Sequence, residues 1–272
     1  MSDAEPFFSV GSDGELHPRP QARSPWSPDM MHGRLLAGLA ARHVEGHHRD
    51  DGLRPARLTT DLFRSPPMEP VVESSRVLRA GRRIKVVEVV QAIAEVEVAR
   101  SVVVLMRSGE HPDGTVWTPD PWDVPGPDDV EVPPDSPMRR LTALEIRAID
   151  GMGMGSDGRR RVWLRDSRAL VDGEAITSFQ RLAMAADFAS PLANSSSEGL
   201  RFINGDITVL VGRLPEGEWI GVEVGAHIGH EGIAVARCDL YDQAGRVAFV
   251  DVSAVTNAPM QPPASPPPSS EA

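Results

Sequence analysis

The chain has 272 residues, with 28 basic and 39 acidic side chains and a net charge of −11 at neutral pH. This length allows two domains of ordinary size, and an apolar fraction of 40% excludes a wholly disordered or collagen-like chain. The excess of carboxylates argues against nucleic-acid partners and anionic membranes. A single cysteine cannot form an internal disulfide, and no apolar run is long enough to span a bilayer. Since the N-terminus lacks signal-peptide features, we expect a soluble cytoplasmic protein.

The first patterned block begins with a predicted helix over residues 27–46. Ser27 suits the N-cap and Pro28 the first helical position, and the apolar residues that follow recur near helical spacing. Strand-like runs follow, bounded by a proline pair, an Ala-Gly pair and a polar turn. They lie at residues 56–63, 71–79, 84–95 and 96–106. The block therefore predicts one helix followed by an antiparallel meander.

A segment rich in proline and acidic residues separates this block from the next. Because proline removes backbone donors and like charges repel, residues 108–138 are predicted to be an extended linker without regular core elements. Trp117 and Trp122 within it are predicted to dock on a neighbouring surface. The tail at 258–272 is predicted to be disordered. The remaining parts are an N-terminal repeat at 1–107 and a C-terminal repeat at 139–257.

The second block has the same internal order. A hairpin at 139–150 and 159–166 leads into a helix that opens with a capping box of Thr177 and Gln180. The strand-like runs of this block lie at residues 207–213, 219–228, 233–241 and 247–255. An offset of 149 superposes the two blocks without a gap, so that Ile84 falls on Ile233. We infer an internal duplication and an α+β fold, in which each copy wraps a long antiparallel sheet around its central helix.

Two motifs that suggest ligand sites have simpler interpretations. Residues 153–158 match G-x-G-x-x-G, but a strand-like run follows instead of a helix, which favours a hairpin turn over a dinucleotide site. His43, His47 and His48 lie at a predicted helix C-terminus, where they suit the helix dipole. Their spacing with Glu45 does not match the H-E-x-x-H zinc motif, so a metal is the less favoured alternative.

Asp187 is the strongest catalytic candidate by position. It lies at the margin of the apolar face of the second helix, beside Ala183, so packing draws its carboxylate toward the sheet. Partial desolvation there raises the pKa of a carboxyl and its basicity toward water. The alternative is a helix-end aspartate bonded to a nearby backbone amide, the commoner role. Nucleophilic catalysis has no support, because there is no serine elbow and Cys238 lies mid-strand as an expected core thiol.

The helix-and-meander repeat resembles the thioesterase-like superfamily, and more closely the double-hotdog acyl-CoA thioesterases of type II and their actinobacterial relatives. The segments that carry the resemblance are MHGRLLAGLAARHVEG, RPARLTTDLFRSPPMEPV, RLAMAADFAS, FINGDITVLVGRLPEGEWIGVEV and LYDQAGRV. Together the similar regions cover residues 23–106 and 139–256. The resemblance implies a pseudo-dimer of two hotdog repeats that binds a thioester at its seam. It also implies acyl-CoA hydrolysis in lipid metabolism without a cofactor.

The family's site residues carry over unevenly. Family members orient a hydrolytic water with an Asp on the second helix, a Thr or Ser opening the next strand and a Gln on the last strand. In this sequence Asp187, Asn204 and Val252 fall on those positions. Val252 cannot bond a water, and losing one such group costs about 10²–10³-fold in rate. Weak activity, recruitment of Thr208 or Ser253, and loss of activity remain as alternatives.

General-base hydrolysis is the mechanism that the resemblance implies. Asp187 deprotonates a water, Asn204 helps to orient it, and backbone amides near His32 and Gly33 at the first turn of the first helix stabilise the oxyanion. Thr208 is a further candidate for substrate binding, and the expected site contains no metal.

Two other functional classes compete with the hydrolase. A non-catalytic module that binds an acyl-CoA or another acyl ligand is favoured by the missing glutamine and opposed by the aspartate. A hotdog hydratase is disfavoured, because neither copy has an Asp and a His at the spacing that those enzymes need. The expected ligand is an acyl-CoA or related thioester, and a homo-oligomer is compatible with the pattern.

Overall fold

The computed structural model describes residues 5–49, 52–132, 144–149 and 153–257 of the chain. Its first half contains β1 (Phe8–Val10), β2 (Leu16–Pro18), η1 (Pro20–Ala22), β3 (Arg23–Ser24), β4 (Ser27–Met31), α1 (Gly33–His47), β5 (Leu53–Leu62), β6 (Val72–Ala80), β7 (Ile84–Ile93) and β8 (Val96–Arg107). Its second half contains η2 (Pro127–Asp129), β9 (Leu144–Ala148), β10 (Arg161–Asp166), α2 (Ser178–Ala186), α3 (Ala189–Asn194), β11 (Ser195–Ser196), β12 (Gly199–Leu200), β13 (Phe202–Asn204), β14 (Asp206–Val211), β15 (Ile220–His230), β16 (Ile233–Asp242) and β17 (Gly245–Thr256). The predicted tail at 258–272 and the linker's end at 133–138 lie outside the described residues.

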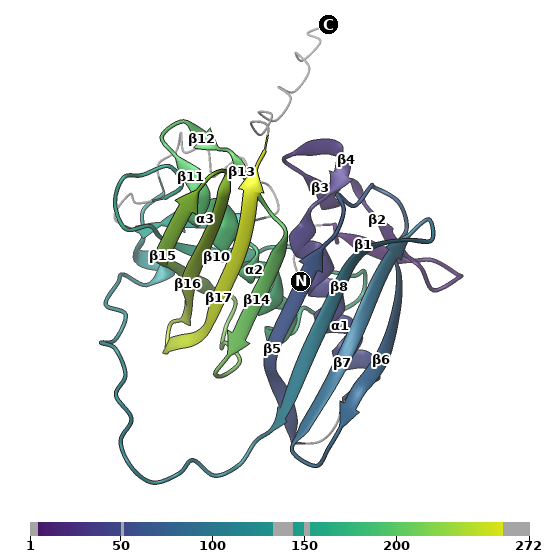
Figure 1. Ribbon diagram of the computed structural model, residues 1–272, viewed down its shortest axis with the longest axis horizontal. Coiled ribbons are helices and arrows are strands. Elements are labelled where there is room, and N and C mark those ends of the chain that lie inside the picture. The colour runs from purple at the N-terminus through teal and green to yellow at the C-terminus, as the bar shows by residue number, and fades with distance from the viewer. Residues whose placement is uncertain (1–4, 50–51, 133–143, 150–152, 258–272) are drawn as a thin grey trace, which may run out of the picture.

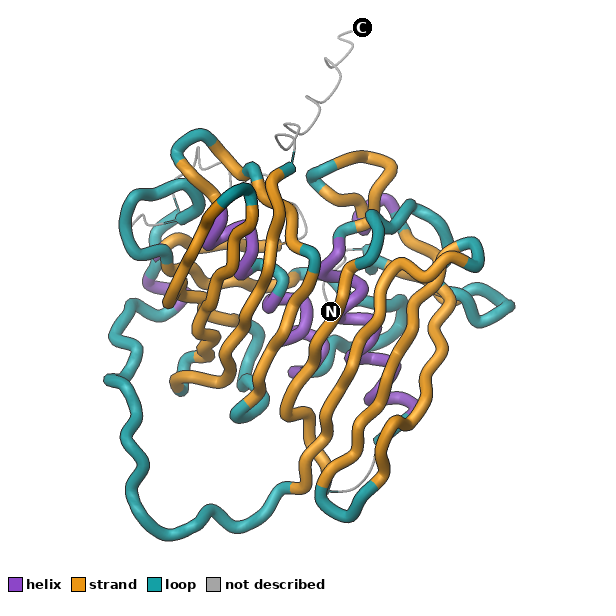
Figure 2. Tube along the Cα trace, in the orientation of Figure 1, coloured by secondary structure: helices purple, strands orange, loops and turns teal. Residues whose placement is uncertain are grey.

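An antiparallel sheet of 11 strands is the frame of the described part of the chain. Its strand order is β6-β7-β8-β5-β14-β17-β16-β15-β10-β9, and β13 also pairs with β17. The two halves meet where β5 pairs with β14, so one sheet runs through both repeats. Figures 1 and 2 show α1, α2 and α3 on the same side of this sheet. The predicted arrangement of meanders around central helices is confirmed.

The duplication is confirmed by the bounds of the strands. The bounds of β16 are those of β7 plus 149, and the bounds of β17 are those of β8 plus 149. At the centre of the sheet Thr208 pairs with Thr59, its own counterpart, and its hydroxyl donates to the Thr59 hydroxyl at 3.2 Å. A residue that faces its own equivalent lies on a local two-fold axis. The two repeats are therefore arranged like the subunits of a symmetric dimer.

The first helix begins later than the sequence predicts. α1 starts at Gly33 with His32 as its N-cap, and the predicted first turn, from Ser27 to Met31, is strand β4. The amide of His32 donates to the carbonyl of Ala22 at 2.8 Å, which ties this segment to the preceding chain. A serine followed by a proline is a local signal for a helix start, and here tertiary pairing outweighs it.

The helices of the two repeats pack against each other. The predicted N-cap is confirmed, since Thr177 accepts from the Gln180 amide at 3.1 Å. The side chains of both residues donate to Glu45 on α1, at 2.7 and 3.1 Å. At the crossing of α1 and α2, a Cβ added to Gly38 would lie 2.6 Å from Cγ of Met184. Glycine at position 38 is therefore what lets the two helices approach so closely.

Side chains alternate between the core and the outer face of the sheet. On β14, Ile207 and Val209 are fully buried under the helices, whereas Thr208 between them lies on the outer face. The thiol of Cys238 is in the same core, and burial raises its pKa to about 12. The predicted place of this thiol in the core is confirmed, and burial of this kind lowers the reactivity of a cysteine.

The linker joins the two repeats, and Figure 1 shows it as a long loop that leaves the end of β8 and runs clear of the sheet toward the second repeat. As predicted, its residues 108–126 form neither helix nor strand, but residues 127–129 within the predicted linker form the short 3-10 helix η2. Trp122 docks, since its ring stacks on Tyr241 with centroids 4.1 Å apart and meets Trp163 edge-on at 4.9 Å. Trp117 is 83% exposed, so the prediction that it docks was wrong. Val124 and Val130 pack against the same cluster of Ile149, Trp163 and Trp219, so several apolar side chains of the linker hold it to the second repeat.

The predicted hairpin before the second helix is confirmed. β9 and β10 pair antiparallel, and the described part of their connection, residues 153–160, contains turns and bends. The G-x-G-x-x-G segment is thus followed by a strand and lacks the helix N-terminus that a pyrophosphate needs. None of the helices in the described ranges has the length and apolar character of a membrane span.

Candidate functional site

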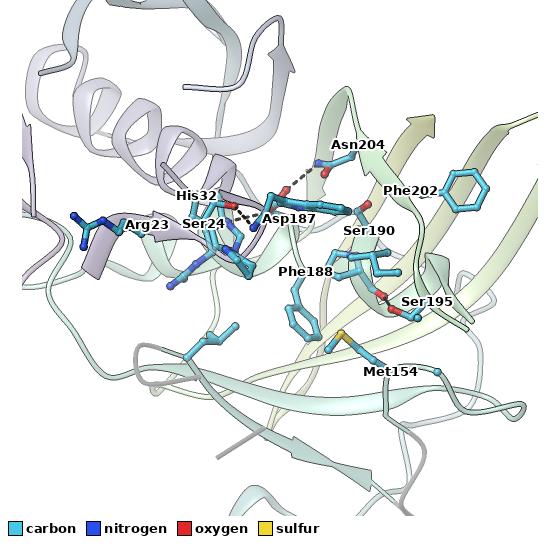
Figure 3. Close-up of a pocket in the computed structure, with 18 of the residues that line it drawn as sticks. Arg23, Ser24, His32, Met154, Asp187, Phe188, Ser190, Ser195, Phe202 and Asn204 are labelled. Atoms are coloured by element: carbon cyan, nitrogen blue, oxygen red, sulfur yellow. Dashed lines mark hydrogen bonds and ion pairs between the residues drawn. The ribbon is translucent and has the colours of Figure 1, made fainter. Parts of the chain in front are cut away.

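A cavity of about 540 Å³ is lined by residues from both repeats. Its volume lies within the range of small-molecule sites, about 300–1,000 Å³. Most of the wall is apolar and includes Phe7, Trp26, Leu144, Met154, Phe188 and Phe202. The polar side chains of the wall come from several elements of both repeats. One group of them, with His32 and Asp187, lies where the start of α1 meets the junction of α2 and α3 (Figure 3). The cavity therefore suits a ligand that has both an apolar part and a polar part.

Asp187 is the central polar group of this wall. It is the C-cap residue of α2, at the break between α2 and α3, and it is 6% exposed. Its Oδ1 accepts a hydrogen bond from Asn204 Nδ2 at 2.8 Å, and the backbone amide of Arg34 also donates to the carboxylate. Asn204 lies on β13 of the same repeat and Arg34 on α1 of the other. The carboxylate is therefore fixed by both halves of the chain.

Burial raises the pKa of Asp187 above its ordinary value of 3.8. The hydrogen bond from Asn204, the positive charge of Arg34 and the Arg34 amide each favour the carboxylate and oppose this rise. The site thus holds an aspartate that is more basic than an exposed one, which is the property expected of a general base. Asp187 lies at the end of its helix, as the sequence predicts. It also bonds a backbone amide, which is the feature that the alternative interpretation predicts.

His32 lies beside this carboxylate, at a distance that gives an ion pair only when the imidazole is protonated. Its Nδ1 is 3.6 Å from Asp187 Oδ2, too long for a hydrogen bond. Burial and the nearby Arg34 cation lower the pKa of His32 from 6.5 to about 3. The imidazole is therefore neutral at physiological pH and contributes a polar ring to the wall.

Arg34 is a cavity residue that the sequence analysis missed. Its guanidinium is buried and forms an ion pair with Asp166 of β10 at 2.6 Å, while its charge also lies 5.1 Å from the ring centre of Phe7. The signal in the sequence was an arginine inside an apolar helical stretch, which must find a buried anion in another element. That anion comes from the second repeat, so the pair joins the two halves at the cavity.

The predicted site residues divide into two groups. The structure brings Asp187, Asn204 and His32 together at the cavity. It does not bring Gly33 or Thr208 there. Gly33 starts α1 beside Leu62 and does not line the cavity, and Thr208 faces outward from the sheet to bond Thr59. On the strand, successive side chains point to opposite faces, which is why the Thr208 side chain lies on the outer face and not at the cavity.

The position expected to carry a family glutamine is apolar and closed. Val252 on β17 is 3% exposed and belongs to the core cluster under the helices. Ser253, the neighbouring polar candidate, is exposed on the outer face and bonds Asp206 through its hydroxyl. Neither residue lines the cavity.

The first repeat has no aspartate at the position equivalent to Asp187. Subtracting 149 from Asp187 leads to Gly38, which has no side chain and lies against Met184 and Leu170. The pseudo-symmetric position is therefore filled by helix packing, and it lacks a carboxylate.

Clusters of possible metal ligands lie away from the cavity. His43 and His48 at the end of α1 both bond the Ser75 hydroxyl, at 2.9 and 2.8 Å. Within the described ranges, one group of carboxylates and histidine has ligand atoms close enough for an ion, namely Asp13, Glu15 and His17 at the β1–β2 turn. Neither cluster shares a residue with the cavity wall.

Sequence models of two domains match the chain. The acyl-CoA thioesterase N-terminal domain matches residues 22–106, and the acyl-CoA thioesterase C-terminal domain matches residues 119–250. The two matches correspond to the two repeats. No protein of curated function matches the sequence.

Solved structures share the fold across nearly the whole chain. A provisionally assigned thioesterase II from Thermobifida fusca is 16% identical with a TM-score of 0.73, over 95% of this chain and 98% of that one. A hot-dog-fold protein from Alicyclobacillus acidocaldarius is 18% identical with a TM-score of 0.71, over 90% and 92%. An acyl-CoA thioesterase II from Mycobacterium marinum is 19% identical with a TM-score of 0.59, over 83% and 90%. The expected hotdog fold is confirmed.

Proposed function

Because the chain belongs to the acyl-CoA thioesterase family, we propose that it hydrolyses an acyl-CoA thioester to the free acid and CoA, with Asp187 as the general base. The observation that carries this proposal is the buried Asp187 carboxylate at the wall of an apolar cavity formed by both repeats. Two hydrogen-bond donors, Asn204 and the Arg34 amide, hold it. An ionised carboxylate has about four acceptor sites, so it can still accept from a water.

The reaction follows from this placement. Asp187 accepts a proton from a water whose oxygen attacks the thioester carbonyl carbon. The tetrahedral intermediate then breaks its carbon–sulfur bond, and the proton on Asp187 passes to the departing CoA thiolate. Asn204 keeps the carboxylate oriented throughout, and no covalent intermediate forms. The apolar wall receives the acyl chain.

Binding without turnover is the second candidate, and the observation that favours it is Val252. An apolar, closed residue at that position offers the water no hydrogen bond. Loss of one such group lowers turnover by about 10²–10³-fold, so we propose a slow enzyme. A chain that binds the ligand and does not hydrolyse it would be the limiting case.

Thiol release from a panel of acyl-CoAs, from short to long acyl chains, tests the proposal. We expect CoA to be released fastest from the acyl chain that fills the apolar cavity, as measured with a thiol-reactive dye. Binding of a non-hydrolysable thioether analogue is measured in parallel. Binding without thiol release at any chain length would establish the binding module, and neither binding nor release would refute both candidates.

The pH profile of kcat tests which group is the base. Turnover requires the Asp187 carboxylate, so kcat should fall as pH falls through a raised pKa, with the acid limb above pH 3.8. His32 is neutral down to about pH 3 and should not contribute a limb. In the His32→Gln variant the acid limb should therefore stay in place. A limb that disappears in this variant would assign the titration to His32.

A further inference from the structure

In the proposed hydrolysis, neither Asp187 nor Asn204 donates a hydrogen bond to the thioester carbonyl oxygen. The Arg34 amide at the first turn of α1 is engaged by Asp187, and Gly33 does not line the cavity. Negative charge develops on the carbonyl oxygen when water attacks, and such an oxyanion normally needs at least one fixed donor. Another polar group on the cavity wall is needed to donate this hydrogen bond.

Ser190 is a polar cavity residue close to Asp187 along the chain. It is 2% exposed, lines the cavity and donates its backbone amide to the Asp187 carbonyl at 3.2 Å. Because the two residues are three apart at the start of a helix, their side chains share one side of it. Figure 3 shows Ser190 next to Asp187 on the wall.

The hydrogen bonds behind Ser190 set the direction in which its hydroxyl donates. His227 Nε2 donates to Asn194 Oδ1 at 3.0 Å, which leaves the Asn194 amide group as a donor. Asn194 Nδ2 then donates to Ser190 Oγ at 3.3 Å. The Ser190 oxygen is thus an acceptor in this chain of bonds, and none of the described residues accepts its proton. Its O–H is available to a ligand in the cavity.

We propose that the Ser190 hydroxyl donates a hydrogen bond to the thioester carbonyl oxygen and stabilises the oxyanion, with Asn194 and His227 as positioning residues. Ser190 keeps its proton throughout, because Asp187 is the group that accepts the proton from water. This donor acts on the carbonyl oxygen, and it does not replace the group that would bond the water at position 252. This inference rests on the proposed hydrolysis.

A second serine of the same wall provides a matched control. Ser195 is 6% exposed and also lines the cavity, but its hydroxyl donates to the Pro191 carbonyl at 2.6 Å. Its proton is therefore not available to the substrate. Ser190→Ala should lower kcat by about 10²–10³-fold with little change in KM, whereas Ser195→Ala, which removes a hydroxyl whose proton is already engaged, should lower kcat far less. Equal kcat in the two variants and the parent would overturn the proposal.

Asn194→Asp tests the direction of the bonds while Ser190 is retained. An ionised aspartate only accepts, so it takes the Ser190 proton away from the cavity. We expect kcat to fall toward the value for Ser190→Ala, and Ser190→Ala combined with Asn194→Asp should fall no further. Unchanged kcat in Asn194→Asp would mean that Ser190 already donates to residue 194, which refutes the proposal.

A measurement that does not depend on turnover distinguishes the role proposed for Ser190 from the proposed hydrolysis. The probe is a ketone analogue of acyl-CoA in which a methylene replaces the thioester sulfur and the carbonyl carbon is ¹³C. Its carbonyl resonance should lie further upfield in Ser190→Ala than in the parent, and Ser195→Ala should match the parent. If the parent hydrolyses no acyl-CoA, the proposed function fails. If it does, but the resonance is the same in all three proteins, the assignment of Ser190 fails.

Discussion

Replacing Asp187 with asparagine should lower kcat by about 10²–10⁴-fold, because the variant cannot accept the proton from water. The amide is nearly the same size as the carboxyl and can still accept from Asn204, so the fold should persist. Affinity for a thioether analogue of acyl-CoA should change far less than kcat. Steady-state thiol release and analogue binding by calorimetry measure the two effects.

Asp242→Asn is the control for the loss of a buried carboxylate. Asp242 is 2% exposed, pairs with Arg213 and accepts from the Glu216 and Ala244 amides, and on balance these contacts lower its pKa despite its burial. Its carboxylate is therefore stabilising, and this stability is lost as pH falls through the lowered pKa. Its loss should lower the free energy of unfolding and leave kcat per folded molecule unchanged. If Asp187→Asn behaves in the same way, Asp187 is a structural aspartate.

Removing Arg34 should cost about 3–5 kcal/mol of the free energy of unfolding. The side chains of Arg34 and Asp166 are 5% and 2% exposed, and Arg34→Ala leaves the Asp166 carboxylate buried without its partner. Most of this loss in the free energy of unfolding is the desolvation penalty of the unpaired, buried Asp166 carboxylate, and it exceeds what an exposed ion pair contributes. Urea denaturation of the variant and the parent at neutral pH measures the difference.

The Arg237–Asp251 pair provides the comparison for this measurement. Its atoms are 2.7 Å apart, but the side chains are 57% and 38% exposed on the outer face of the sheet. Solvent screens such a pair, so Arg237→Ala should cost about 0–1 kcal/mol. Similar costs for the two arginines would show that burial does not determine the contribution of the Arg34 pair.

The sequence predicted the parts of the fold that depend on repetition. A gapless offset places Ile84 on Ile233, and strands β7 and β16 begin at these residues. Strand bounds are well predicted because each copy constrains the other. The start of α1 was wrong because Ser27 carries a local helix-start signal, while a backbone bond from His32 to Ala22 was not visible in the pattern.

The site was predicted as far as single residues can be matched to a family position. Asp187 and Asn204 are hydrogen-bonded at 2.8 Å as their matched positions suggest. Arg34 could not be assigned, because its role depends on Asp166, a partner 132 residues away in the sequence. Ser190 is bonded by Asn194, four residues along the chain, but the orientation of that amide depends on His227, which is 33 residues further on.

The difference between Asp187 and Gly38 has an evolutionary consequence. In a dimer of identical subunits, any substitution is inherited at both symmetry-related positions, so a mutation that helps one position is imposed on the other. Fusion of the two copies into one chain removes that coupling. Position 38 can then carry the glycine that close helix packing requires, while position 187 carries the buried aspartate that we propose as the base. Neither half now carries a complete site, and selection must therefore act on the pair as one unit.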